Sequence, residues 1–300
     1  MIMFHQVNKK IEKATILDDI SMTVNKGSIY GLLGSNGAGK TTILKLLAGI
    51  LKQDSGEITV NGKEVFEHID TKKQLFFLPD YPTFFPQYSI KQMAKFYKVT
   101  YPSWDDSLYE KLAEIFTLDP NKKIHTYSKG LQRQAAFWFA FAACPEVLIL
   151  DEPFDGLDPV IRTKVKNLLV QVVAEREMTV IISSHNLREV EDLCDHVSII
   201  HQGKCLLEKD IDDLKADIHK IQIAFKNGAE KVAFNKLDVL SIEQRGSVHT
   251  MIIKGNKKKI LSVLEEHQPI LLDILPLTLE EIFIYEMEDQ NYAIESLLLS

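Results

Sequence analysis

A run of eight residues near the N-terminus has the residue types and the spacing that bind a chain of phosphates. The run Gly34-Ser35-Asn36-Gly37-Ala38-Gly39-Lys40-Thr41 fits the pattern G-x-x-x-x-G-K-[ST]. Its glycines let successive backbone N–H groups turn inward, and the helix start that follows adds partial positive charge where phosphate oxygens would lie. The ammonium of Lys40 can reach the β- and γ-phosphates, and the hydroxyl of Thr41 can ligate Mg²⁺. The sequence therefore predicts a nucleotide site.

Two adjacent carboxylates follow a short apolar run further along the chain. Val147–Leu150 has the composition of a buried strand, and Asp151 and Glu152 come directly after it. In open α/β sheets ligands bind beyond the carboxyl ends of the strands, so we expect Asp151 near the Mg²⁺ held by Thr41. Neighbouring side chains on a strand point in opposite directions, so we expect the turn at Pro153 to aim Glu152 at an attacking water. The alternative is a strand that ends in two solvated acids.

A second helix start and a histidine complete the set of candidate residues. Ser128 and Gly130 open a helix, and a small hydroxyl with a glycine there can seat another anion or act as a simple cap. His185 follows the strand Thr179–Ser183, whose carboxyl end points to the same edge of the sheet as the nucleotide. Its imidazole could contact a γ-phosphate and position Glu152, whereas a lone histidine after a strand is otherwise structural.

An α/β core is expected to position these side chains. Strand-like and helical patterns alternate through about residue 205. An alternating segment, Gly56–Val60, ends in an Asn-Gly turn. Between residues 81 and 145 the pattern becomes helical and aromatic, which indicates a helical insertion with a helix over Asp106–Phe116. The four clearest strands are Ile29–Leu33, Leu75–Leu78, Val147–Leu150 and Thr179–Ser183.

A different pattern begins near Asp210. Alternating runs at 221–225, 239–244, 248–254 and 270–275, with a helix before the last, predict a small α+β region. Thr278 and Glu281 form a capping box ahead of a final helix. We therefore expect two domains, at residues 1–208 and 209–300.

The composition is that of an ordinary globular chain. Of 300 residues, 45% are hydrophobic and 26% charged, and the net charge of −7 offers no overall basic field for nucleic acid. The run Lys257–Lys259 predicts a solvated helix start. The cysteines Cys144, Cys194 and Cys205 follow no metal-ligand spacing, so we expect reduced thiols in the cytosol. The N-terminus lacks the regions of a signal peptide, and the longest apolar stretch, Ala135–Cys144, is about half a membrane span. We expect a cytoplasmic protein whose membrane work is done through partners.

Four elements together resemble the ATP-binding cassette (ABC) family of transport ATPases over about the first 205 residues. In the order of the chain they are the phosphate loop, the helix start at Ser128, the carboxylates Asp151 and Glu152, and His185. The resemblance implies an α/β P-loop NTPase core with an inserted helical subdomain, ATP as substrate and Mg²⁺ as cofactor. Gly34 through Thr42 would form Walker A, with Lys40 a catalytic residue on the phosphates. The other roles that it implies are Mg²⁺ ligation by Thr41 and Asp151, a catalytic base in Glu152, a switch histidine in His185, clasping of a partner's γ-phosphate by Ser128 and Gly130, and bridging of a dimer by Asp158 in the D-loop.

Three positions depart from the family's pattern. The usual signature is Leu-Ser-Gly-Gly-Gln, and three of its residues are replaced here, by Tyr127, Lys129 and Leu131. The loop that usually offers a glutamine to the metal and the water carries Asp80, a shorter and charged substitute that is a third candidate metal ligand. The aromatic residue that usually stacks on adenine is absent near Ile11, which could pack on the base apolarly.

The resemblance also implies phosphoryl transfer to water in sites shared between two chains. Each site takes Ser128 and Gly130 from a facing cassette, which is another copy or a related chain, and the closing motion is passed to polytopic membrane permease subunits. The wording around the motifs resembles export cassettes of Gram-positive bacteria, among them ATPases linked to antimicrobial-peptide resistance, acetoin-related operons and secretion of phenol-soluble modulins. We expect an ATPase that powers export of a peptide, antimicrobial or other amphipathic compound, held at the inner face of the cell membrane by permease subunits, with no nucleic-acid partner.

Two alternatives stay open beside this interpretation. A cassette ATPase without transport would act on ribosomes or DNA, but such members carry two cassettes or long coiled coils, and this chain has a single phosphate loop. A non-catalytic nucleotide-binding regulator is opposed by Glu152 and His185. The aromatic segment Tyr81–Tyr88 is the expected docking surface for a membrane subunit, with ordinary packing of the helical insertion as the alternative.

Overall fold

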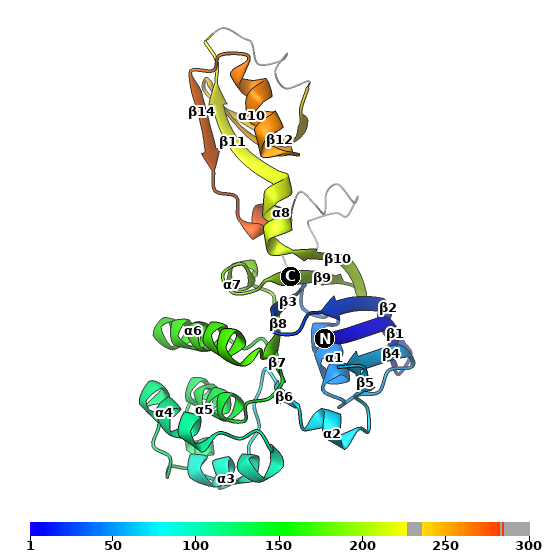
Figure 1. The fold of residues 1–300 in the computed structure, drawn as a ribbon, viewed down its shortest axis with the longest axis vertical. Coiled ribbons are helices and arrows are strands. Elements are labelled where there is room, and N and C mark those ends of the chain that lie inside the picture. Colours follow the sequence, from blue (N-terminus) through cyan, green and yellow to red (C-terminus); the bar gives the residue numbers. More distant parts are fainter. Residues whose placement is uncertain (227–235, 283, 285–300) are drawn as a thin grey trace. The chain divides into compact units, whose positions relative to one another are not determined.

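The chain forms two compact units, Met1–Glu208 and Lys209–Ser300. The structure is a computed structural model that describes residues 1–226, 236–282 and 284 (Figure 1). Within these residues no helix is long and apolar enough to cross a membrane.

A six-stranded sheet forms the centre of the larger unit. Its strand order is β10-β9-β3-β8-β7-β6, and the pairs β9–β3, β3–β8, β8–β7 and β7–β6 are parallel. The side chains of β3, β7 and β8 are buried throughout, as expected for strands covered on both faces. All four strands that the sequence predicts are confirmed, two of them one residue longer at the carboxyl end. The bounds are β3 Ile29–Leu33, β6 Leu75–Leu78, β7 Val147–Asp151, β8 Thr179–Ser184, β9 His196–His201 and β10 Lys204–Asp210.

A second, antiparallel sheet has the order β2-β1-β4-β5, from β1 Ile2–Ile11, β2 Ala14–Val24, β4 Ser55–Val60 and β5 Lys63–Glu64. The predicted Asn-Gly turn joins β4 to β5, with Asn61 at φ 52° and Gly62 at φ 75°. The sequence did not predict β1 and β2, because register shifts in their pairing interrupt the period-two pattern.

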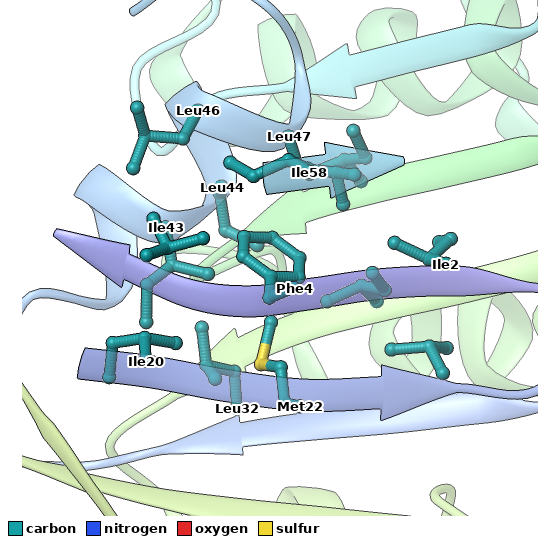
Figure 2. Packing of buried hydrophobic residues seen from close by; sticks show 14 of the residues in the cluster. Ile2, Phe4, Ile20, Met22, Leu32, Ile43, Leu44, Leu46, Leu47 and Ile58 are labelled. Carbon is teal, nitrogen blue, oxygen red and sulfur yellow. The ribbon is translucent and has the colours of Figure 1, made fainter. Parts of the chain in front are cut away.

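The antiparallel sheet fixes the helix that follows the phosphate loop. This helix, α1, spans Lys40–Leu47 and buries Ile43, Leu44 and Leu47. Figure 2 shows these side chains against Phe4 of β1 and neighbouring residues of β2, β3 and β4, which belong to one buried cluster. Both the helix and the loop before it are thereby held against a packed core.

The helical insertion lies beyond edge strand β6 (Figure 1). Its helices are α3 Ile90–Thr100, α4 Asp106–Phe116, the short 3₁₀ helix η1 Ile124–Thr126, and α5 Lys129–Ala142. The bounds of α4 match the prediction, and α5 buries every residue from Arg133 to Ala142. The remaining helices of the unit are α2 Ile69–Lys72, α6 Pro159–Arg176 and α7 Leu187–Glu191. The predicted α/β core with a helical insertion is confirmed.

The smaller unit is an α+β fold, also as predicted. It contains α8 Ile211–Asp217, β11 Ile218–Ala224, β12 Asp238–Arg245, β13 Val248–Lys254, α10 Lys257–Glu265 and β14 Leu271–Leu275. Its antiparallel sheet has the order β12-β13-β11-β14, and its core joins residues of β11, β13 and α10. The capping box is confirmed, because Glu281 N–H donates to Thr278 Oγ1 at 3.2 Å and Thr278 N–H donates to Glu281 Oε2 at 3.0 Å. The final helix lies largely outside the described residues.

Candidate active site

The phosphate loop connects β3 to α1, and glycine is required at both of its ends. Gly34 has φ 154°, and a Cβ there would lie 2.2 Å from the carbonyl oxygen of Ile200. Gly39 has φ 111° and is the N-cap of α1, where a Cβ would lie 2.7 Å from a methyl group of Leu17. Because neither position tolerates a side chain, the path of the loop is fixed.

The loop lines a cavity of about 360 Å³. Ile11, at the end of β1, is 45% exposed and forms part of the wall, where we predict the adenine ring to pack. Gly34 is absent from the lining and shapes the turn instead. The complete lining is Ile11, Ile16, Ser35, Asn36, Gly37, Ala38, Gly39, Lys40, Thr41, Thr42, Asp80 and Glu152.

Lys40 lies inside the loop with its side chain only 6% exposed. Its Nζ donates to the carbonyl oxygens of Gly34 at 2.6 Å and Ser35 at 3.2 Å. It also forms an ion pair with Glu152 Oε1 at 3.4 Å. The cation is thus held where a phosphate chain would lie in this loop, beside the predicted base.

Thr41, which lines the cavity, contacts Asp151 at the end of β7. Thr41 Oγ1 donates to Asp151 Oδ1 at 3.1 Å, and Ser183 Oγ donates to the same oxygen at 2.7 Å. Hydroxyl and carboxylate oxygens are the hard ligands that Mg²⁺ prefers, so this pair fits the ion that the family's chemistry needs. Sequence reasoning assigned no role to Ser183. Its only signal was a hydroxyl at the end of the strand next to β7.

The backbone and the side chain of Glu152 both have partners within the chain. Its φ of 44° lies in the left-handed region, so the chain turns at Glu152 itself, one residue earlier than the predicted turn at Pro153. The Glu152 N–H donates to Ser183 Oγ at 3.0 Å. His185 Nδ1 lies 2.9 Å from Glu152 Oε2, so the structure brings the three predicted catalytic side chains, Lys40, Glu152 and His185, together. Ligand atoms of Glu152, Asp155 and His185 also lie within 4.8 Å of one another.

Glu189 of helix α7 contacts Ser184, the residue before His185. Burial raises the pKa of Glu189, and the nearby Arg162 guanidinium, 3.3 Å from its carboxylate, works against that rise. Ser184 Oγ donates to the other Glu189 carboxylate oxygen at 3.3 Å. These contacts fix the residue before His185.

The signature residues lie apart from this cavity. Ser128 is the N-cap of α5, and its Oγ accepts from Leu131 N–H at 3.4 Å. Gly130 is required by a close approach, since a Cβ there would lie 2.7 Å from the carbonyl oxygen of Gly156. Among the described residues, none that line the nucleotide cavity come from the signature segment 127–134.

Two further predicted residues have partners within the chain. Asp158 is the N-cap of α6, where its Oδ1 accepts from the N–H groups of Val160 and Ile161 at 3.1 Å. Asp80 Oδ1 accepts from Arg133 Nη2 at 2.8 Å. Sequence reasoning assigned no role to Arg133, although a cation directly before a long buried apolar run is an available signal.

The sequence matches the protein-family model described as "ABC transporter" over residues 17–155. ABC transporter ATP-binding protein YtrB of Bacillus subtilis (strain 168) is 35% identical over 284 residues, which cover 95% of this chain and 97% of that protein. The chain belongs to the ABC transporter ATP-binding proteins.

This ABC ATPase has further relatives of the same kind. Bacitracin transport ATP-binding protein BcrA of Bacillus licheniformis is 30% identical, with 88% of each chain covered. A solved structure described as an ATP-binding subunit of an ABC transporter superposes with a TM-score of 0.67 at 25% identity, covering 72% of this chain and 92% of that one. The chain therefore binds ATP and is an ATPase.

Proposed function

We propose that this ABC ATPase powers export of a peptide, antimicrobial or other amphipathic compound through separate membrane permease subunits. The observation that carries the hydrolytic part is the position of Glu152, whose carboxylate lies between Lys40 and His185 at the wall of the phosphate-loop cavity. The same geometry opposes a non-catalytic regulator, which needs no base there. Similarity to a bacitracin transport protein over 88% of each chain supports the export part.

The residues of the cavity divide the work of hydrolysis. The loop N–H groups and Lys40 bind the phosphate chain of ATP, and Thr41 with Asp151 would hold Mg²⁺. When bound, Mg²⁺ neutralises charge on the phosphate oxygens. Glu152 accepts the proton of the attacking water, while His185 Nδ1 keeps the carboxylate aimed. Ile11 packs on the adenine ring of ATP.

We assign this chemistry to residues 1–208 and an accessory role to 209–300. Because Ser128 and Gly130 do not line the described nucleotide cavity of their own chain, they are proposed to contact the γ-phosphate bound by a second cassette. A second copy and a related chain both suit this arrangement. In it Asp158, at the start of α6, faces the partner cassette.

The permease is proposed to dock on the segment Tyr81–Tyr88, at the inner face of the membrane. Tyr81 is 69% exposed, and Phe85 is 47% exposed with its ring 5.0 Å from that of Phe96. Phe84 instead packs against Phe139 of α5, with ring centroids 6.0 Å apart. Phe85 is therefore the outward member of the pair and the one available to a partner.

Replacing the base tests the hydrolytic assignment. Glu152→Gln keeps the shape of the side chain and removes the proton acceptor, so we expect kcat to fall by about 10²- to 10⁴-fold. ATP affinity should be retained, and an ATP-bound dimer should accumulate on size-exclusion chromatography. Glu175→Gln, an exposed position on α6, is the matched control and should hydrolyse ATP like the wild type. Wild-type turnover in Glu152→Gln would show that Glu152 is not the base.

A further inference from the structure

Arg133 connects two loops around the active site. It lies one turn inside α5, and its side chain is only 7% exposed. Nη1 donates to the carbonyl oxygens of Glu152 at 2.7 Å and Asp155 at 2.6 Å. Nη2 donates to Asp80 Oδ1 at 2.8 Å and also to the Asp80 carbonyl oxygen. One guanidinium therefore holds the loop after β6 and two positions of the connection between β7 and α6.

The two carbonyl groups need a donor from outside the sheet. The ladder between β7 and β8 ends at the pair Asp151–Ser183, so the carbonyls of Glu152 and Asp155 lie beyond it. Partly or fully buried carbonyls are almost always paired. A guanidinium offers five N–H donors in one plane, which lets a single side chain serve several acceptors.

The charge of Arg133 is balanced by Asp80. A buried cation is stable only with a close counter-charge and satisfied hydrogen bonds, and the Asp80 carboxylate at 2.8 Å supplies the first. Asp80 lines the nucleotide cavity and also a neighbouring cavity of about 310 Å³ formed by the loop after β6, the start of α5 and Gly156. The ion pair thus stands between the two cavities.

We propose that Arg133 is a positioning residue for hydrolysis, and that its ion pair with Asp80 keeps it in place. A left-handed φ is rare for a residue with a side chain, so the turn at Glu152 depends on its contacts. Its N–H donates to Ser183 Oγ, and its carbonyl oxygen accepts from Arg133 Nη1 at 2.7 Å and from Asp155 N–H at the longer distance of 3.4 Å. Loss of the short, charged contact with Arg133 loosens the turn and misdirects the carboxylate, while the phosphate loop stays intact. The proposal rests on Glu152 being the base of the proposed function.

Kinetics on the full-length protein test this role. Arg133→Gln should lower kcat by about 10- to 100-fold, because a misplaced reacting group costs rate and not affinity. KM for ATP and the affinity for ATP measured by equilibrium binding should change little. Arg133→Lys keeps the cation and one donor direction, and it should recover part of the lost rate. Asp80→Asn should lower kcat less than Arg133→Gln, and the double variant should be no slower than Arg133→Gln alone.

A control separates this role from plain stability. Arg176→Gln removes another guanidinium, paired with Asp105 at 2.9 Å away from the cavity, and should lower the melting temperature without changing kcat. Any one of four outcomes would overturn the proposal. They are an unchanged kcat in Arg133→Gln, an effect of Arg133→Gln on KM alone, no recovery of rate in Arg133→Lys, and additive losses when Arg133→Gln is combined with Asp80→Asn. If Arg133→Gln does not fold, unchanged kcat in both Arg133→Lys and Asp80→Asn overturns it.

The two hypotheses fail in different ways. Wild-type hydrolysis by Glu152→Gln defeats the proposed function itself. An inactive Glu152→Gln combined with full kcat in Arg133→Gln defeats the positioning role alone.

Discussion

Two helix starts in the larger unit carry the residues predicted to touch phosphate, and they are built differently. α1 begins at the left-handed Gly39 without a side-chain cap, and its first two residues reach the carboxylates of Asp151 and Glu152 at the end of β7. α5 begins at Ser128, whose hydroxyl caps its own helix, and its polar anchor is Arg133 in the next turn. The first start lies beside the side chains of its own chain that are predicted to be catalytic.

The difference teaches which start needs a partner. Lys129 and Gly130, at the beginning of α5, line the neighbouring cavity and not the one that holds the phosphate loop. A seat of this kind is useful only if phosphate is brought to it, and the proposed source is the nucleotide on a second cassette. Arg133 then has a structural reason to be where it is, because it aligns this helix with the loops of its own site.

Mixing two inactive variants would break the comparison most decisively. Lys40→Ala removes the cation at the start of α1, and Ser128→Arg places a bulky side chain at the start of α5. Each variant alone should lose hydrolysis, measured as phosphate release. A mixture of the two should regain it, because a mixed dimer pairs one intact α1 with one intact α5. A mixture that stays inactive while forming mixed dimers would place both starts in one chain's site.

The surface near α5 gives a smaller effect. Phe85→Asp should reduce co-purification with a polytopic membrane subunit by about tenfold or more, because a buried charge in an apolar contact is costly. ATP hydrolysis by the purified subunit should be unchanged. Ile69→Asp, which places the same charge at a 69% exposed position on α2, is the control. Equal recovery of the membrane subunit with both variants would locate docking elsewhere.

The smallest effect concerns the far end of α5, where Cys144 follows the helix. Burial raises the pKa of the Cys144 thiol, and burial also raises the pKa values of Cys194 and Cys205. A raised pKa leaves less thiolate at a given pH, so iodoacetamide should label the folded protein more slowly than the unfolded protein at pH 7 to 8. Mass spectrometry reports each site. Rapid labelling of Cys144 in the folded protein would show that the end of α5 is looser than its contacts indicate.

Local signals accounted for much of the fold and of the site. The phosphate loop, the strands β3 and β6, helix α4 and the Asn-Gly turn each depend on neighbours within a few residues, and the sequence predicted them. β1 and β2 were missed because their register shifts disturb the alternation. Ser183 and Arg133 were missed because their partners lie 19 to 53 residues away along the chain, at distances where spacing carries no signal.

The turn at Glu152 was placed one residue late for a related reason. Pro153 marked a break in the strand, which is a local signal, but the left-handed conformation of Glu152 is set by contacts with β8 and α5. A prediction based on neighbouring residues therefore placed the turn at Pro153, whereas the chain turns at Glu152.

The narrow gap between Gly130 and Gly156 has a consequence for genetics. Any side chain at residue 130 must push aside a carbonyl of its own chain. A screen for inactive alleles will therefore recover changes at Gly130 whether or not that residue ever meets a nucleotide, and such alleles report crowding against Gly156. Ser128 is exposed and its hydroxyl caps the Leu131 N–H, so alleles at Ser128 are the ones expected to carry information about the proposed partner cassette.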